Sequence, residues 1–326
     1  MTGKYTYHFA ALLFAVPILI LVPLTTATTF QQAPGPPAVQ APGGIGARGQ
    51  RGAPAGPPAP VPPAVAIPRP TVDELARINA SLKRFVDTNT SSDSAVLKKY
   101  ADLINVAMPR ANSAIAPVQT QVRTTERHDG FVETAKNGNF DILFAGDSIT
   151  DWWQQSAGQG GGVDVQKKYF GDVKIANFAV AGDTTQGVLW GLQNGEGQGH
   201  KPKAVMLMIG TNNNSQGNSA AEIAEGVGAV VYELRKDFPD AKILLLAIFP
   251  RGAGPTDASR MRNDDANKII ARLDDGKHVF FRIINDKFLD AQGSLIGFRN
   301  DNVHPNPQGY EIWATAVAET LKGWTK

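Results

Sequence analysis

The sequence predicts an α/β protein in which a five-stranded parallel sheet lies between two layers of helices. Five short apolar runs alternate with longer segments whose apolar residues recur at helical spacing. The runs contain little apolar–polar alternation, which is typical of parallel strands that are buried on both faces. Right-handed crossovers between such strands place helices on both sides of the sheet. We therefore expect a three-layer α/β/α sandwich that is preceded by a small helical segment.

The composition narrows the classes of protein that fit. The chain of 326 residues has a net charge of +2 and no cysteine, and 42% of its residues are hydrophobic. So small a net charge does not favour a nucleic-acid partner. The absence of cysteine excludes disulfide bonds, thiolate catalysis and cysteine-bound zinc. The hydrophobic content is sufficient for one ordinary domain core with extensions.

The first 27 residues follow the order of a secretory signal. A short polar start with Lys4 precedes an apolar run over residues 9–24, and small residues follow it. The run is short for a membrane-spanning helix, which needs about 20 residues, and Pro17 and Pro23 interrupt it. We expect this segment to direct export to the periplasm or the cell exterior. An uncleaved segment that anchors the protein in a membrane is the alternative.

Residues 28–70 are rich in proline, glycine, alanine and glutamine and contain few large apolar side chains. A segment of this composition cannot bury enough apolar surface to offset the conformational entropy that it loses on ordering. We therefore predict a disordered, extended linker.

Residues 71–125 are predicted to form a helical preface. Thr71 and Glu74 have the spacing of a capping box, and apolar residues follow at helical intervals. A second amphipathic pattern over residues 96–107 ends before Pro109. The two helices are expected to form a hairpin, for which the pattern predicts no function.

The remaining chain, residues 126–326, is predicted to form the α/β domain. The predicted strands are 141–145, 173–178, 203–209, 242–248 and 279–284. The predicted helices are 164–170, 184–193, 220–237, 257–274 and 306–322. In open parallel sheets a functional site lies at the carboxyl ends of the strands. Ser148, Gly182 and Asn212 each follow a predicted strand, so we expect them to meet at one edge of the sheet.

A serine and a histidine stand in short blocks that suit nucleophilic chemistry. Ser148 follows an apolar run across a Gly-Asp turn, and Asp301 precedes His304 by three residues. A serine hydroxyl becomes a strong nucleophile when an imidazole takes its proton and a carboxylate orients that imidazole. We therefore predict a triad of Ser148, His304 and Asp301. The pattern Gly-x-Ser-x-Gly does not occur, which argues against the common α/β-hydrolase elbow.

Two further residues are candidates for stabilising an oxyanion, together with the backbone amide of Ser148. Gly182 lets the backbone approach a substrate and donate its amide, although a glycine can also serve the loop conformation alone. Asn212 offers a neutral side-chain donor, although asparagine-rich loops are often plain turns. Asp183, which follows Gly182, is predicted as a helix N-cap rather than as a catalytic group.

Taken in order, these blocks resemble the SGNH (GDSL) hydrolase family over roughly residues 125–326. In that family the corresponding residues are the nucleophilic serine, an oxyanion glycine, an oxyanion asparagine and the catalytic histidine with its acid. The match assigns these roles to Ser148, Gly182, Asn212, His304 and Asp301. Within this family the chain resembles the catalytic subunits of intracellular platelet-activating-factor acetylhydrolase and their bacterial esterase relatives, through segments such as Gly182-Asp183-Thr184-Thr185-Gln186 and Pro250-Arg251-Gly252. This resemblance implies a flavodoxin-like fold, short acyl groups that are often acetyl, and no metal or organic cofactor.

The leading interpretation is a serine esterase that hydrolyses short-chain, above all acetyl, carboxylic esters through an acyl-enzyme. Its partner would be a small ester such as an O-acetylated carbohydrate, because the expected export and the proline-rich segment depart from the animal enzymes. A phospholipid, lysophospholipid or thioester hydrolase with the same triad is the alternative. A catalytically silent binding module tethered to the cell envelope is a further one. A homodimer is left open, and membrane contact is expected only through an uncleaved N-terminal segment.

Three residues near the blocks are candidates for lining the substrate pocket. Trp152 and Trp190 suit an acyl or sugar pocket, but ordinary core packing explains them equally well. Arg251 suits binding of an anionic group, but pairing with a carboxylate is the preferred interpretation.

Overall fold

The computed structural model of the protein describes residues 55–326. The predicted signal segment, residues 1–27, and residues 28–54 of the predicted linker lie outside the described residues. Within residues 55–326, no helix combines the length and the apolar character needed to cross a membrane.

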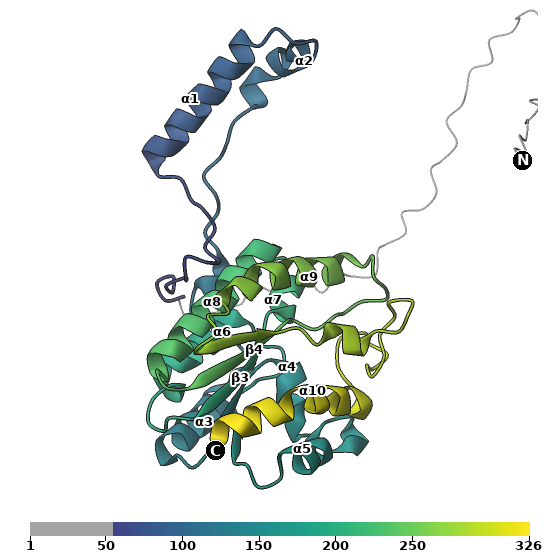
Figure 1. Ribbon diagram of the computed structural model, residues 1–326. Helices are drawn as coiled ribbons and strands as arrows, with labels where there is room; N and C mark the ends of the chain where they lie inside the picture. Colours follow the sequence, from purple (N-terminus) through teal and green to yellow (C-terminus); the bar gives the residue numbers. More distant parts are fainter. Residues whose placement is uncertain (1–54) are drawn as a thin grey trace, which may run out of the picture. The chain divides into compact units, whose positions relative to one another are not determined.

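Five parallel strands form one sheet in the order β2-β1-β3-β4-β5 (Figure 1). The strands are β1 (Ile142–Gly146), β2 (Ile175–Asn177), β3 (Ala204–Met208), β4 (Lys242–Leu246) and β5 (Val279–Arg282). Because β1 lies between β2 and β3, the chain reverses its direction of winding at β1, and a functional site is expected beside that strand. The predicted five-stranded parallel sheet is confirmed.

Helices and short turns connect these strands. The helices of the domain are α3 (Thr125–Asn137), α4 (Ser148–Asp151), α5 (Val163–Phe170), α6 (Thr185–Gly191), α7 (Thr211–Ser215), α8 (Ala220–Asp237), α9 (Ala258–Ile270) and α10 (Pro307–Thr325). The five predicted helices correspond to α5, α6, α8, α9 and α10. The pattern did not predict α3, because its sequence is mostly polar and buries only His128 and Ala135.

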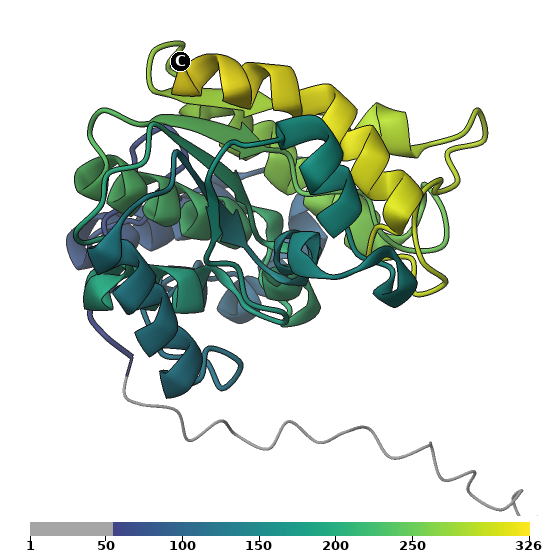
Figure 2. The ribbon, with the colours of Figure 1, turned by 90° about the horizontal axis from the view of Figure 1, so that it is seen from below.

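Alternate residues of the strands point into two separate hydrophobic cores. In β3, Val205 and Leu207 belong to one core, while Met206 and Met208 belong to the other. Helices α8 and α9 cover the first core, and α5 and α10 cover the second (Figures 1 and 2). This two-sided burial explains why the strands read as continuous apolar runs.

The last part of the predicted linker is not a free segment, which corrects the expectation for residues 55–70. The Ala59 amide donates to the Ile115 carbonyl at 2.7 Å, and the Ala59 side chain is buried. Val65 is 3% exposed and packs on α8 at Gly228, where a Cβ atom would lie only 2.5 Å from it. We call residues 55–70 the proline-rich strap. The strap has few large apolar residues, which suggested disorder. It packs instead through small side chains against a surface that a glycine leaves open.

An ion pair joins the end of the strap to α8. The Arg69 guanidinium donates to both carboxylate oxygens of Glu225, at 2.7 and 2.6 Å. The Ile67 amide and the Asn112 side chain donate to the same carboxylate, whose side chain is fully buried. Burial raises the pKa of Glu225, but these donors outweigh it, so the pKa lies below its usual range. The strap is therefore part of the α/β domain.

The helical preface forms the predicted hairpin only in part. Helix α1 (Val72–Thr88) begins with the predicted capping box at Thr71. The second helix is shorter than predicted, because α2 spans only Ser94–Lys99 and a 3₁₀ turn at Ala101–Leu103 follows it. Leu103 is 78% exposed, so its side chain has no packing surface that would extend the helix.

The hairpin is inserted between two segments that pack on the domain, which shifts the predicted boundary at residue 126. Asn112, Ala114 and Arg123 are all buried, and residues 55–326 belong to one compact unit. The packed domain therefore begins with the strap and resumes near residue 110.

Candidate active site

Ser148 occupies the junction between the central strand β1 and helix α4. Strand β1 ends at Gly146, and the Asp147 carboxylate caps α4 by accepting from the Ile149 amide at 3.1 Å. Ser148 is therefore the first helical residue, and its side chain stands at the carboxyl edge of the sheet. Only 5% of Ser148 is exposed, so bulk water has little access to its hydroxyl.

The structure brings the three predicted triad residues into one hydrogen-bonded chain. The Ser148 Oγ lies 2.8 Å from the His304 Nε2. The other ring nitrogen, Nδ1, lies 2.7 Å from the Asp301 Oδ2. With Nδ1 protonated and facing the carboxylate, Nε2 is free to accept the serine proton. Ser148 and His304 are 156 residues apart in sequence.

Asp301 is held in place by its own turn as well as by the imidazole. Its Oδ1 accepts from the backbone amides of Val303 at 2.9 Å and His304 at 3.0 Å. Partial burial raises the pKa of Asp301, but the amides and the His304 ring outweigh it, and the pKa falls below its usual range. Asp301 therefore remains an anion whenever the imidazole needs an acceptor.

The loop that carries Gly182 is tied to the serine helix. Gly182 has a φ of +83°, which a residue with a side chain adopts only with strain, so the glycine serves the loop conformation. The neighbouring Ala181 amide donates to the Asp151 Oδ2 at 3.0 Å, and Asp151 belongs to α4. Arg127 on α3 binds the other Asp151 oxygen at 2.5 Å. The sequence pattern assigns no role to Asp151 or Arg127, because nothing in it distinguishes them from ordinary surface charges.

Asn212 reaches the same loop from the end of β3. Its side-chain amide donates to the Asp183 carbonyl at 2.7 Å, and the side chain is only partly buried. One hydrogen of this amide is thus used to fix the side chain, while the second remains free for another acceptor. The next residue, Asn213, binds the Thr185 amide at 3.0 Å and fixes the start of α6.

Asp183 is not the helix N-cap that the sequence suggested, because Thr184 occupies that position. The Asp183 carboxylate instead accepts from Arg123 at 2.9 Å and from Thr120 at 2.9 Å. Arg123 also binds Glu196, which a π-helical turn over Leu192–Glu196 directs inward. This buried ion cluster supports the Gly182 loop through Asp183, the residue that follows Gly182. The sequence pattern does not predict the cluster, because its members are far apart in sequence.

The three pocket candidates have different surroundings. Trp152 lies against the predicted base, with its ring centroid 4.1 Å from that of His304. Trp190 lies instead against His128 at 4.6 Å. Arg251 donates to the Thr211 carbonyl and hydroxyl and to the Ser215 hydroxyl. Within residues 55–326 the Arg251 guanidinium makes no ion pair within 4.0 Å. The prediction that Arg251 pairs with a carboxylate is therefore wrong for this part of the chain.

Asp147, beside the serine, is a fully buried carboxyl with one oxygen that has no hydrogen-bond partner among residues 55–326. Burial raises the pKa of Asp147 to about 7, and the charge of Asp183 adds to it, while the Ile149 amide and Arg251 oppose it. Above its unfolded pKa, the native state keeps a proton that the unfolded chain has released. The stability that Asp147 contributes is therefore complete at low pH and is lost as the pH rises towards 7.

Asp147→Asn is expected to remove this part of the pH dependence, because a neutral amide replaces the neutral acid. Between about pH 4 and 7 the wild-type unfolding free energy should fall by up to about 1.4 kcal/mol per pH unit through this group. Urea denaturation of both proteins at several pH values measures the difference. Burial also raises the pKa of Asp237 to about 6, so Asp237 changes the stability with pH in the same direction. Both proteins keep Asp237, and its contribution cancels in the comparison. Parallel stability curves would show that Asp147 ionises normally.

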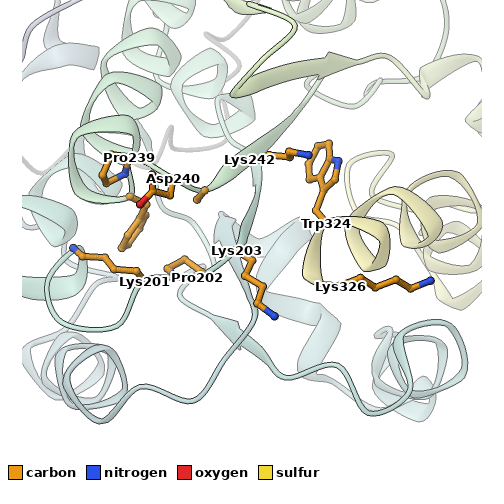
Figure 3. A pocket seen from close by; sticks show the side chains of 10 residues that line it. Lys201, Pro202, Lys203, Pro239, Asp240, Lys242, Trp324 and Lys326 are labelled. Carbon is orange, nitrogen blue, oxygen red and sulfur yellow. The ribbon is translucent and has the colours of Figure 1, made fainter.

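One hollow in the described part of the chain lies away from these groups. It measures about 510 Å³ and is lined at one edge of the domain by lysines, Phe238 and Trp324 (Figure 3). Seven of its lining residues, within 201–203 and 238–241, directly precede β3 and β4, so it lies at the amino ends of these strands, opposite the triad. No group of three acidic or histidine side chains in residues 55–326 is arranged to hold a metal ion.

Comparison with known proteins gives consistent matches for this domain. Residues 144–312 match the GDSL-like lipase/acylhydrolase family. The human platelet-activating factor acetylhydrolase IB subunit alpha2 is 33% identical over 183 residues, which cover 56% of this chain and 73% of that protein. The rat subunit alpha1 is 30% identical over 209 residues, covering 64% and 86% of the two chains.

Solved structures share the fold. A proposed acylhydrolase from Bacteroides fragilis aligns with a TM-score of 0.51 and 15% identity, over 64% of this chain and all of that chain. A protein from Streptococcus pneumoniae, described as a proposed platelet activating factor, aligns with a TM-score of 0.50 and 21% identity. That alignment covers 60% of this chain and 91% of the other.

Proposed function

This chain belongs to the GDSL-like lipase/acylhydrolase family and is a carboxylic ester hydrolase, and from this premise we propose that it cleaves short-chain esters through an acyl-enzyme on Ser148. The observation that carries the proposal is the hydrogen-bonded chain from the Ser148 hydroxyl through His304 to Asp301. Its distances of 2.8 and 2.7 Å are those of a base that is ready to accept a proton.

In the first step, the Ser148 Oγ attacks the ester carbonyl carbon while its proton moves to the His304 Nε2. Asp301 stabilises the imidazolium through Nδ1. The carbonyl oxygen becomes an oxyanion, for which the Ser148 and Gly182 amides and the free Asn212 hydrogen are the donors. Collapse of the tetrahedral species breaks the ester bond, and His304 returns the proton to the leaving alcohol.

In the second step, water attacks the acyl-serine. His304 takes a proton from the water, and the same donors hold the second oxyanion. The acid then leaves, and the proton returns to the Ser148 oxygen. Together the two steps consume one ester and one water, release one alcohol and one acid, and return Ser148 and His304 to their starting states.

The proposed acyl preference is for acetyl groups. The family relatives with 30–33% identity are named acetylhydrolases. If the N-terminal segment directs export, as its sequence suggests, O-acetylated carbohydrate outside the cytoplasm is a fitting substrate class. An acetylated phospholipid is the second candidate, because those relatives are named for platelet-activating factor.

Hydrolysis of p-nitrophenyl acetate and octanoate by the full chain tests this proposal. We expect faster turnover of the acetate, together with a fluorophosphonate adduct located on the Ser148 peptide by mass spectrometry. Preference for the octanoate would favour the lipid alternative. Folded protein that neither hydrolyses an ester nor carries the adduct would favour a silent binding module. Acetate turnover with a label on another serine would overturn the assignment of Ser148.

A further inference from the structure

The side chains of Trp152, which directly follows α4, and Arg299, in the loop that carries His304, are stacked on each other beside the proposed base. The Trp152 indole lies 4.1 Å from the His304 ring between centroids, at an interplanar angle of 30°. The guanidinium carbon of Arg299 lies 4.2 Å from the centroid of the Trp152 ring. These contacts place the guanidinium within roughly 8 Å of the imidazole. We call these three side chains the aromatic stack.

Hydrogen bonds fix the guanidinium end of the aromatic stack. Arg299 Nη2 donates to the backbone carbonyls of Gln159 and Gly160, both at 2.8 Å. Gly160 has a φ of +77°, and a Cβ atom there would lie 2.7 Å from Nη2, so only a glycine leaves room for the guanidinium. The Arg299 amide also donates to the His304 carbonyl at 2.8 Å. Arg299 thus joins the loop after α4 to the loop that carries the base.

The same loop also fixes the indole from its backbone side. The Trp152 carbonyl accepts from the amides of Gln155 and Gly162, at 3.1 and 3.0 Å. Trp152 directly follows α4, whose first residue is Ser148. The indole against which the His304 ring packs is therefore attached to α4, the helical turn that carries Ser148.

The His304 ring moves through its χ1 and χ2 torsions, and the hydrogen bonds to Asp301 and Ser148 act only at its two nitrogens. A flat partner at stacking distance packs against the face of the ring and so limits tilting of the ring plane. Proton transfer depends on this alignment, because small displacements of a catalytic group can cost about 10²-fold in rate.

We propose that Trp152 and Arg299 are positioning residues for the base of the proposed ester hydrolysis: the indole fixes the ring plane of His304, and Arg299 fixes the indole. This inference rests on the proposed function of Ser148 and His304. It goes beyond it by assigning roles to two residues whose side chains form no hydrogen bond to Ser148 or Asp301 within residues 55–326. The inference gives Trp152 a supporting role in addition to its predicted place at the substrate pocket.

The test compares Trp152→Leu and Trp152→Phe in the full chain with p-nitrophenyl acetate as substrate. We expect Trp152→Leu to lower kcat by about 10- to 100-fold with little change in KM. Trp152→Phe, which keeps a flat ring, should restore most of the rate. Trp324→Leu is the matched control, because Trp324 also stacks on a ring, that of Phe280 at 5.0 Å, at the distant hollow (Figure 3). Equal activity of Trp152→Leu and wild type would overturn the proposal, as would a rise in KM alone.

A second comparison tests the role of Arg299 itself. Arg299→Met should lower kcat with little change in KM, because the indole loses the guanidinium that fixes it. Lys242→Met is the control, because Lys242 lies over Trp324, 5.7 Å from the ring centroid, and its loss should leave kcat unchanged. An Arg299→Met protein with wild-type kcat would contradict the positioning role of Arg299.

Nuclear magnetic resonance keeps this inference separate from the proposed function. In Ser148→Ala protein the His304 Hε1 signal can be observed without any turnover. Adding Arg299→Met, which keeps the indole, should shift and broaden the signal because the ring plane is released. If wild type hydrolyses no ester but the His304 signal changes in this way, the proposed function is wrong and the positioning role of Trp152 and Arg299 is supported. If esters are hydrolysed and the signal does not change, the positioning role is wrong.

Discussion

Ser148→Ala is expected to reduce kcat/KM for p-nitrophenyl acetate by about 10⁴-fold or more, because the hydroxyl that contacts His304 is removed. The residual rate would come from the oxyanion donors and from water activated by the base. The side chain is small and loses one oxygen, so the fold and the unfolding free energy should change little. Initial rates beside a thermal denaturation curve measure both quantities.

Two companion variants make this result specific. Ser156→Ala removes an exposed serine from a nearby turn and should leave the rate unchanged. Asn212→Ala removes a proposed oxyanion donor and should lower kcat by about 10²- to 10³-fold, which is less than the loss of the nucleophile. A Ser148→Ala protein that retains a tenth of the wild-type rate would place the nucleophile elsewhere.

Arg123→Met is expected to destabilise the protein by about 3–5 kcal/mol, because it leaves two carboxylates buried without their cation. Arg123 is 1% exposed, and its partners Asp183 and Glu196 are 0% and 3% exposed. Burial opposes the charge of the guanidinium, but both carboxylates outweigh this effect and raise the pKa of Arg123. Urea denaturation with a fixed slope gives the difference in unfolding free energy.

The carboxylates themselves supply the control for this interpretation. Combining Arg123→Met with Asp183→Asn and Glu196→Gln should recover part of the lost stability, because no unpaired charge then remains buried. Lys268→Met breaks an exposed pair with Asp265 and should have little effect. If the triple variant is no more stable than Arg123→Met, lost packing rather than unpaired charge explains the cost.

The α/β domain was predictable because its signals are local. Buried parallel strands need apolar side chains on both faces, so each strand is legible as a short apolar run. The proposed site residues were predictable for a related reason. Ser148, Gly182 and Asn212 each follow a strand, and parallel topology gathers the carboxyl ends of strands at one edge.

The strap and α3 were not predictable by the same rules. The strap packs through small residues such as Ala59 against surfaces that glycines open, and apolar periodicity does not register such packing. Helix α3 is mostly polar, and its charged Arg127 serves Asp151 rather than solvent. In both cases the stabilising partner lies far away in sequence.

By itself, the sequence determined the fold class, the five strands, five of the domain's helices, and the residues that carry the proposed chemistry. These depend on residue type and short spacing, which each segment expresses alone. Only the tertiary structure decided that Trp152 and Arg299 stack beside His304, that Arg123 sits between two buried carboxylates, and that the strap belongs to the domain. Such contacts join side chains that are remote in sequence, and their energies exist only once the folded backbone has brought the partners together and excluded water from them.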